Sequence, residues 1–212
     1  IYGGTFDPVH NGHLKVARRV QQSFGLDELF FVPACVPPHK RDAGITSAFH
    51  RFAMLALATE HDERLRVSTI ELDQPERPYA VETVARMEEQ LGSDCRLFFV
   101  MGADSWSEIT TWREWQRLLT MCDHIVVTRP GYELESTAAR RVIDARGKTD
   151  DEIQELVEKT PASGIFLTDV VFDDVSATAI RAAARNGDVA ELAKMAPPEV
   201  AHYIQKYRVY GN

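Results

Sequence analysis

Apolar residues fall along this chain in short continuous runs that alternate with longer amphipathic stretches. The runs have the length and the aliphatic and aromatic content of strands buried in a parallel sheet. They lie at residues 1–2, 28–33, 65–70, 95–101, 123–128 and 165–172. Between several runs the apolar residues recur at helical spacing, as from Leu14 to Phe24. This alternation predicts an α/β fold with a doubly wound parallel sheet and right-handed crossovers.

The pattern changes in two segments. Residues 133–163 are charged and poor in apolar residues, which predicts a surface insertion carrying one or two short helices. Residues 186–212 hold two periodic runs separated by Pro197-Pro198, which predicts a helical tail that serves packing. The 212 residues show no internal repeat and are enough for one sizeable core, so we expect a single domain over 1–212 with a small helical C-terminal region.

Charge and composition narrow the class of protein. The formal net charge of −8 argues against a nucleic-acid partner, which needs a contiguous basic face. No apolar run approaches about 18 residues and no signal-peptide pattern is present, so we expect a soluble, cytoplasmic protein with no membrane surface as partner. Three scattered cysteines fit a reducing compartment. Because the chain opens on a strand, we also expect a few residues to be missing upstream.

The first loop carries the chemistry. Gly3, Gly4, Asp7-Pro8 and Asn11-Gly12 predict a tight, open loop between a strand and a helix. The N-terminus of a helix presents backbone N–H groups and a positive dipole end to an anion. His10 and His13 lie where that helix begins, and each can donate to a phosphate oxygen and become protonated near neutral pH beside a polyphosphate.

Two other readings of this loop are weaker. A His-x-x-His pair can be half of a zinc site, but Cys35, Cys95 and Cys122 lack the CxxC spacing that would supply further ligands. A loop for a nicotinamide cofactor would need glycines at GxGxxG spacing, and this loop has none.

The stretch GGTFDPVHNGHL, residues 3–14, resembles the signature of the HxGH nucleotidyltransferase superfamily. Outside residues 133–163, the chain resembles bacterial nicotinate-nucleotide adenylyltransferases, which implies a Rossmann-like fold. In that family a P-x-x-x-P-P-H-K segment follows the second strand, and Lys40 stands where its lysine would. Read from composition alone, the same residues would be a solvated basic turn.

The resemblance continues near the C-terminus, where the family has I-S-S-T-x-I-R. Ser176, Thr178 and Arg181 match it, whereas Ala177 replaces the second serine and removes one hydroxyl from the implied phosphate site. Ser176 or Thr178 is also a good helix N-cap. Arg51, in a His-Arg pair of the family type, is open between a surface salt bridge and a structural or anion-binding role.

Further matches concern the nucleotide and its pyridine ring. Asp104 follows the strongest strand in a G-x-D, where it can contact the nucleotide or cap the next helix. Trp112 and Trp115 lie three apart and would share one helical face, either in the core or against a pyridine ring. Thr83 matches the family near a Tyr-Thr segment and can instead serve helix packing. Pro78 and Ala80 depart from that segment.

The implied reaction is transfer of the adenylyl group of ATP to nicotinate mononucleotide, which gives deamido-NAD and pyrophosphate in NAD biosynthesis. Magnesium would enter with ATP, without a protein metal cluster. The partners expected are the two substrates, and a homo-oligomer is left open. The implied catalytic residues are His10, His13, Lys40 and Arg181; those for ATP and its phosphates are Gly3, Gly4, Thr5, Phe6, Asp104, Ser176 and Thr178; those for the pyridine nucleotide are Thr83, Trp112 and Trp115.

Alternatives remain in two classes. The same loop serves adenylyl or cytidylyl transfer to other acceptors, such as nicotinamide mononucleotide or phosphopantetheine. A non-catalytic nucleotide-binding module, or a fragment related to class I tRNA synthetases, can also contain an HxGH element. The acidic charge and the lack of a tRNA-binding domain argue against the synthetase.

Overall fold

The computed structural model describes residues 1–35, 44–74, 78–92, 94–128, 142–169 and 175–211. These residues form a seven-stranded sheet in the order β3-β2-β1-β4-β5-β7-β6, and its strand pairs are parallel. The strands are β1 (Tyr2–Gly4), β2 (Leu29–Pro33), β3 (Leu65–Val67), β4 (Phe98–Gly102), β5 (Asp123–Val127), β6 (Val142–Asp144) and β7 (Ile165–Thr168). The predicted Rossmann-like α/β fold is confirmed.

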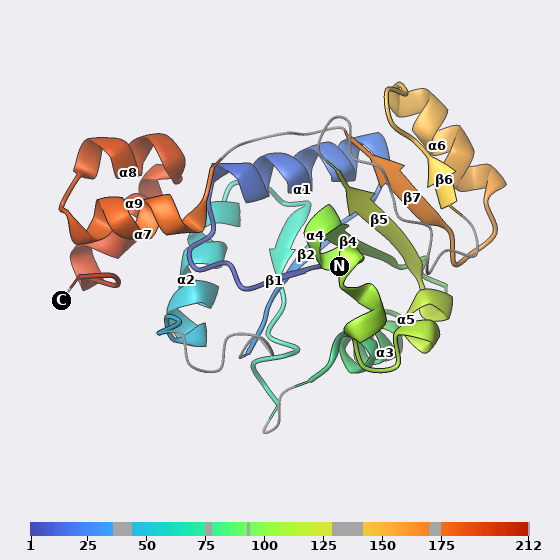
Figure 1. The fold of residues 1–212 in the computed structure, drawn as a ribbon, viewed down its shortest axis with the longest axis horizontal. Coiled ribbons are helices and arrows are strands. Elements are labelled where there is room, and N and C mark those ends of the chain that lie inside the picture. Colours follow the sequence, from blue (N-terminus) through green and yellow to red (C-terminus); the bar gives the residue numbers. More distant parts are fainter. Residues whose placement is uncertain (36–43, 75–77, 93, 129–141, 170–174, 212) are drawn as a thin grey trace.

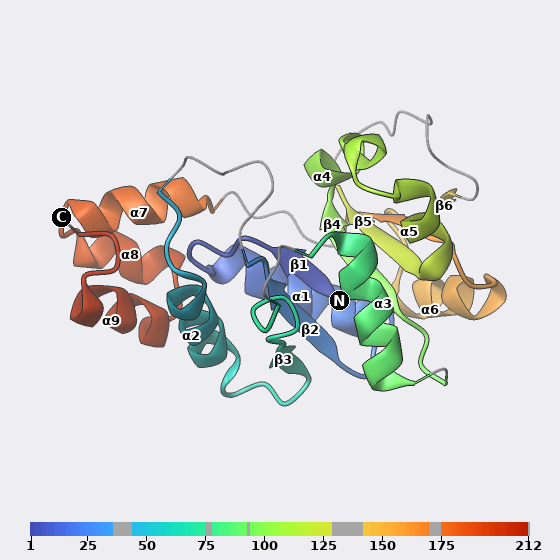
Figure 2. The ribbon, with the colours of Figure 1, turned by 90° about the horizontal axis from the view of Figure 1, so that it is seen from below.

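Helices cover both faces of the sheet (Figure 1). They are α1 (Asn11–Ser23), α2 (Ala48–Thr59), α3 (Ala80–Leu91), α4 (Ala103–Ser107), the 3₁₀ helix η1 (Ile109–Thr111), α5 (Trp115–Met121), α6 (Asp150–Lys159), α7 (Ala177–Arg185), α8 (Val189–Met195) and α9 (Pro198–Tyr207). Helices α1 and α6 lie on one side of the sheet and α3 and α5 on the other, as Figures 1 and 2 show. None of the described helices is long and apolar enough to cross a bilayer.

The strand β4 is buried on both faces, as its continuous apolar run predicts. Phe98 and Val100 pack in the cluster that contains Val20 of α1, whereas Phe99 and Met101 pack in the cluster that contains Val84 of α3. Successive side chains of a strand point to opposite faces, so one apolar run contributes to two cores.

The C-terminal helices α7, α8 and α9 gather beside α2, away from the strand edge formed by β6 (Figure 1). A third apolar cluster joins them to the first half of the sheet, and it includes Leu14, Met54, Ile180 and Val200. The predicted helical tail is present as α8 and α9, with Pro198 at the first turn of α9, where a proline needs no amide hydrogen.

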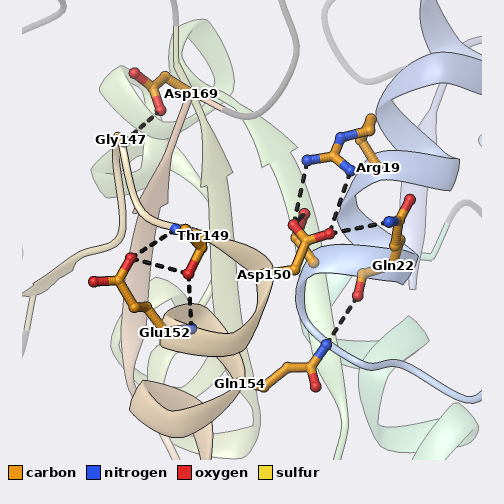
Figure 3. Close-up of polar contacts among 9 residues, drawn as sticks. Arg19, Gln22, Gly147, Thr149, Asp150, Glu152, Gln154 and Asp169 are labelled. Carbon is orange, nitrogen blue, oxygen red and sulfur yellow. Dashed lines mark hydrogen bonds and ion pairs between the residues drawn. The ribbon is translucent and has the colours of Figure 1, made fainter.

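The segment expected as a surface insertion differs from that prediction in its described part, residues 142–163. Strand β6 pairs with β7 at the edge of the sheet, and Ile153 of α6 is buried in the core under α1. Asp150 accepts a hydrogen bond from Ser23 at 2.7 Å. It also accepts from Gln22 at 3.0 Å and pairs with Arg19 at 3.3 Å (Figure 3). The low apolar density of this segment did not reveal that it adds a strand to the sheet. A short edge strand and a half-buried helix need few apolar residues.

Candidate functional site

The strand order places the candidate site between β1 and β4. From β1 the sheet continues in one direction through β2 and β3, and in the other through β4 and β5. In open α/β sheets ligands bind outside the carboxyl ends of the strands, at the point where the order reverses. Here that edge carries the loop from Thr5 to His10 after β1 and the Gly102–Asp104 turn after β4.

The two histidines of the first loop are stacked on each other. The ring centroids of His10 and His13 lie 3.7 Å apart with 29° between the planes. His10 is the N-cap of α1 and does not cap it with its side chain, and His13 lies on the first turn with its ring edge-on to Phe6 at 5.0 Å. Both imidazoles therefore lie at the positive end of the α1 dipole.

The prediction that His13 can be protonated near neutral pH applies once a polyphosphate lies beside the ring, and the protein alone gives this imidazole a low pKa. Burial, and secondarily the charge of His10, lower the pKa of His13 to about 3. Its Nδ1 is buried and has no hydrogen-bond partner among the described residues. His13 is therefore a neutral donor in this structure, and only an anion close to the ring would raise its pKa toward neutrality.

The two glycines lie in the strand and not in the loop, which corrects the prediction. Gly3 and Gly4 are the last two residues of β1. A Cβ on Gly4 would lie 2.8 Å from Cζ of Phe6, so only glycine leaves room for that ring. Phe6 has a φ of 49°, which is costly for a bulky residue, and its ring is buried. Any contact of Phe6 with ATP is thus left to its main chain.

Arg51 holds the loops after β1 and β2 together. The residue is 1% exposed, and its guanidinium donates to the carbonyls of Thr5 at 2.7 Å and Ala34 at 2.6 Å. It also donates to the carbonyls of Cys35 at 3.1 Å and Thr46 at 3.0 Å. Burial lowers the pKa of Arg51, and the negative charge of Asp7 opposes that shift. Of the roles left open for Arg51, the structure shows the structural one.

The last helix of the predicted phosphate site is bonded to the first loop. Ser176 caps α7 by accepting from the backbone N–H of Ala179 at 3.1 Å, as predicted. About one turn into the helix, Arg181 donates to Thr178 Oγ1 at 3.0 Å and to the carbonyl of Asp7 at 2.7 Å. Residues 174 positions apart are thereby brought together, and the start of α7 lies beside the loop that follows β1.

Two predicted residues stay less defined. Lys40 lies outside the described residues. Before that segment, the N–H of Ala34 donates to the carbonyl of Gly4, the last residue of β1, at 2.9 Å. Asp104 is exposed in the first turn of α4 and does not cap that helix, whose N-cap is Gly102.

The predicted pyridine residues pack on the α3 face of the sheet. Thr83 is buried, and its hydroxyl donates to Glu71 Oε1 at 2.8 Å. Burial raises the pKa of Glu71, and the bond from Thr83 is the largest effect that opposes the rise. The hydroxyl proton of Thr83 is therefore already used in this bond. Contact of Thr83 with a pyridine ring stays a prediction, and it would involve an atom other than that proton.

The two tryptophans do not share a helical face, so that prediction is wrong. Trp112 follows η1 in extended conformation, and Trp115 begins α5. Between them Glu114 has a φ of 50°, which breaks the helix. Both indoles are partly buried against the α3 cluster, and Trp112 meets Phe99 edge-on at 6.2 Å. Their contact with a pyridine ring remains a prediction.

Sequence reasoning missed the side chain of Asp7 and the role of Tyr210. The Asp7 carboxylate accepts from Tyr210 Oη at 2.8 Å and from the Thr46 N–H at 3.3 Å. No local pattern signals a contact between residues 203 positions apart. Among the described residues, no group of three or more His, Cys, Asp or Glu side chains could hold a metal ion.

The amino-acid sequence matches a known family and many of its members. The model of the family described as cytidylyltransferase-like matches residues 1–183. A probable nicotinate-nucleotide adenylyltransferase of Thermoanaerobacter sp. (strain X514) is 37% identical over 210 residues, which cover 99% of this chain and 92% of the relative. Another of that name from Citrifermentans bemidjiense is 33% identical, covering 99% and 96%.

Solved structures share the fold. The nicotinic acid mononucleotide adenylyltransferase of Plasmodium falciparum complexed with NaAD has a TM-score of 0.72 at 19% identity, covering 99% of this chain and 95% of that one. The same enzyme complexed with APC has a TM-score of 0.71 at 18% identity, covering 99% and 94%.

Proposed function

The chain belongs to the cytidylyltransferase-like family, and we propose that it transfers the adenylyl group of ATP to nicotinate mononucleotide. The products are deamido-NAD and pyrophosphate. The choice of substrates is supported by the relatives, which are named nicotinate-nucleotide adenylyltransferases and match almost the whole chain.

One structural observation carries the assignment of phosphate chemistry. The bond from Arg181 to the carbonyl of Asp7 joins the start of α7 to the loop that leads into the His10–His13 stack. A guanidinium, two imidazoles and the N-terminus of α1 then lie around one loop at the reversal point of the sheet. These groups are cationic or donor groups, which suits a polyphosphate even in a protein whose formal net charge is −8.

The chemistry requires alignment more than activation. The 5′-phosphate of nicotinate mononucleotide is already a nucleophile, so it attacks the α-phosphorus of ATP in line, and the bond to the pyrophosphate oxygen breaks. His13 donates a hydrogen bond to the transferring phosphate, and Arg181 and Lys40 neutralise charge that develops on the leaving oxygens. Magnesium, if carried in by the phosphate oxygens of ATP, would offset phosphate charge without ligands from the described residues.

The acid form of the pyridine is favoured for an electrostatic reason. A site of backbone N–H groups near the Trp112–Trp115 segment would donate to a carboxylate, and such charge-assisted bonds contribute about 1.5 to 3 kcal/mol each. A nicotinamide NH₂ would face those same donors with no acceptor. We therefore expect kcat/KM for nicotinate mononucleotide to exceed that for nicotinamide mononucleotide by at least about tenfold.

The test is turnover of the purified protein with ATP, magnesium and three acceptors in parallel: nicotinate mononucleotide, nicotinamide mononucleotide and phosphopantetheine. Products are separated by chromatography and pyrophosphate is measured. Deamido-NAD as the fastest product supports the proposal. A faster reaction with phosphopantetheine, or with CTP in place of ATP, would move the protein to another branch of the family, and no pyrophosphate with any acceptor would indicate a non-catalytic module.

A further inference from the structure

A buried carboxylate links the first loop to the segment that follows α9. Asp7 is 7% exposed and Tyr210 is 8% exposed. The Tyr210 hydroxyl donates to Asp7 Oδ1 at 2.8 Å, and the Thr46 N–H donates to Asp7 Oδ2 at 3.3 Å. A buried carboxylate needs such partners, because each bond that it lacks leaves charge without solvation. Burial and the negative charge of Asp7 raise the pKa of Tyr210, so its hydroxyl keeps the proton that it donates.

Asp7 is connected to the proposed catalytic residues through its main chain. Its carbonyl accepts the bond from Arg181 at 2.7 Å, and it stands three residues before His10. Thr46, whose N–H donates to the Asp7 carboxylate, accepts a hydrogen bond from Arg51 at its own carbonyl. A rotation of the Asp7 side chain would therefore disturb the peptide that positions Arg181 and the chain that leads to the histidine stack.

We propose that Tyr210 is a positioning residue for adenylyl transfer, acting through Asp7 on Arg181 and the His10–His13 stack. Tyr210 lies beyond residues 1–183, the part of the chain that the cytidylyltransferase-like model matches. The tail thus contributes to the site as well as to packing. The inference rests on the proposed function for its kinetic consequence, but the contact itself stands on geometry.

The test variant is Tyr210→Phe, which keeps the buried ring and removes only the hydroxyl. Tyr207→Phe is the matched control, because Tyr207 is 53% exposed and lies on α9 outside the proposed link. With ATP, magnesium and nicotinate mononucleotide, we expect Tyr210→Phe to lower kcat about tenfold, with KM for nicotinate mononucleotide changed less than about threefold. Displacement of Arg181 or the histidines should reduce stabilisation of the transition state more than it reduces binding of the substrate. Tyr207→Phe should stay within about twofold of wild type.

A double-variant comparison distinguishes positioning from general stability. Asp7→Ala removes the acceptor of the Tyr210 hydroxyl, whereas an asparagine would keep one. If the hydroxyl acts through Asp7, adding Tyr210→Phe to Asp7→Ala should lower kcat by less than about threefold, because the link is already absent. The same tenfold loss in both backgrounds would overturn the proposal, as would a kcat for Tyr210→Phe within twofold of wild type.

A spectroscopic measurement tests the link without turnover. The ring proton signals of His10 and His13 are assigned by NMR with His→Gln variants, among the 7 histidines of the chain. We expect both signals to shift in Tyr210→Phe and to stay in place in Tyr207→Phe, whereas unchanged signals in Tyr210→Phe would overturn the proposal. If wild-type protein turned over no substrate, the proposed function would fail while this measurement still decided whether Tyr210 positions the loop.

Discussion

Replacing Arg51 by lysine should cost more stability than an Arg-to-Lys change normally does. The residue is 1% exposed, and its guanidinium donates to four backbone carbonyls at 2.6 to 3.1 Å. Lysine keeps the charge but has a single nitrogen, which cannot reach acceptors on three separate segments in the fork geometry of arginine.

The magnitude follows from the bonds that would be lost. If lysine keeps two of the four bonds, two charge-assisted bonds of about 1.5 to 3 kcal/mol each disappear, and their carbonyls stay buried. After partial relaxation we expect a loss of about 3 kcal/mol in the free energy of unfolding. For a chain of this size, each kcal/mol lowers Tm by about 2 to 4 °C, so the shift should be about 6 to 12 °C.

Urea unfolding followed by circular dichroism measures this loss, with Arg18→Lys as the control. Arg18 is 53% exposed and pairs with Asp62 at 3.1 Å, so its replacement should change stability by less than about 0.5 kcal/mol. A loss below about 1 kcal/mol for Arg51→Lys would mean that the four carbonyls find other partners, and the view of Arg51 as the link between the two loops would be refuted.

Three further predictions concern the site and its charges. His13→Ala removes a donor to the transferring phosphate, so kcat should fall roughly a hundred- to thousandfold with the fold intact, and near-normal turnover would show that the site is misassigned. Arg181→Ala should raise KM for ATP more than Arg117→Ala does, because Arg117 is exposed and paired with Glu114; equal ATP dependence would contradict the placement. Burial keeps His13 and His124 neutral with pKa values of about 3 and about 4, so the unfolded chain binds more protons below pH 6.5. The free energy of unfolding should therefore fall as pH drops from 6.5, by up to about 1.4 kcal/mol per unit for each group, and urea titrations at pH 7.5 and 5.5 should show a smaller fall in His124→Leu.

The parts of the fold that were predictable are those with a local signal. Apolar runs located β2, β4, β5 and β7, and alternation gave the parallel sheet, because burial on both faces leaves a continuous apolar pattern. A hydroxyl cap on α7, at Ser176 or Thr178, was predictable because a hydroxyl side chain before a helix commonly accepts from its first N–H groups, and the structure shows the cap at Ser176. Strand β6 carried no such signal, since two of its three residues are exposed.

The rest of the site depended on backbone geometry and distant contacts. Trp112 and Trp115 fit a helical spacing, but the left-handed Glu114 between them cannot be read from residue types. The hydrogen bonds from Thr83 to Glu71 and from Tyr210 to Asp7 depend on the completed fold. Neither pair has a sequence spacing that a helix or a strand would bring together. The role of Arg51 was ambiguous for the same reason. Its four acceptors are backbone carbonyls, which every residue has, so the sequence does not show them.

Helix α1 makes a side-chain hydrogen bond at each of its ends, and the two bonds go to parts of the molecule that lie far apart. At its start, Asn11 donates to the carbonyl of Lys194 at 3.1 Å, and at its end Ser23 donates to Asp150 at 2.7 Å. Its 13 residues span about 20 Å at 1.5 Å per residue. The two bonds join the first turn of α1 to α8 and its last turn to α6, so this one helix connects the C-terminal helices with the β6 edge of the sheet.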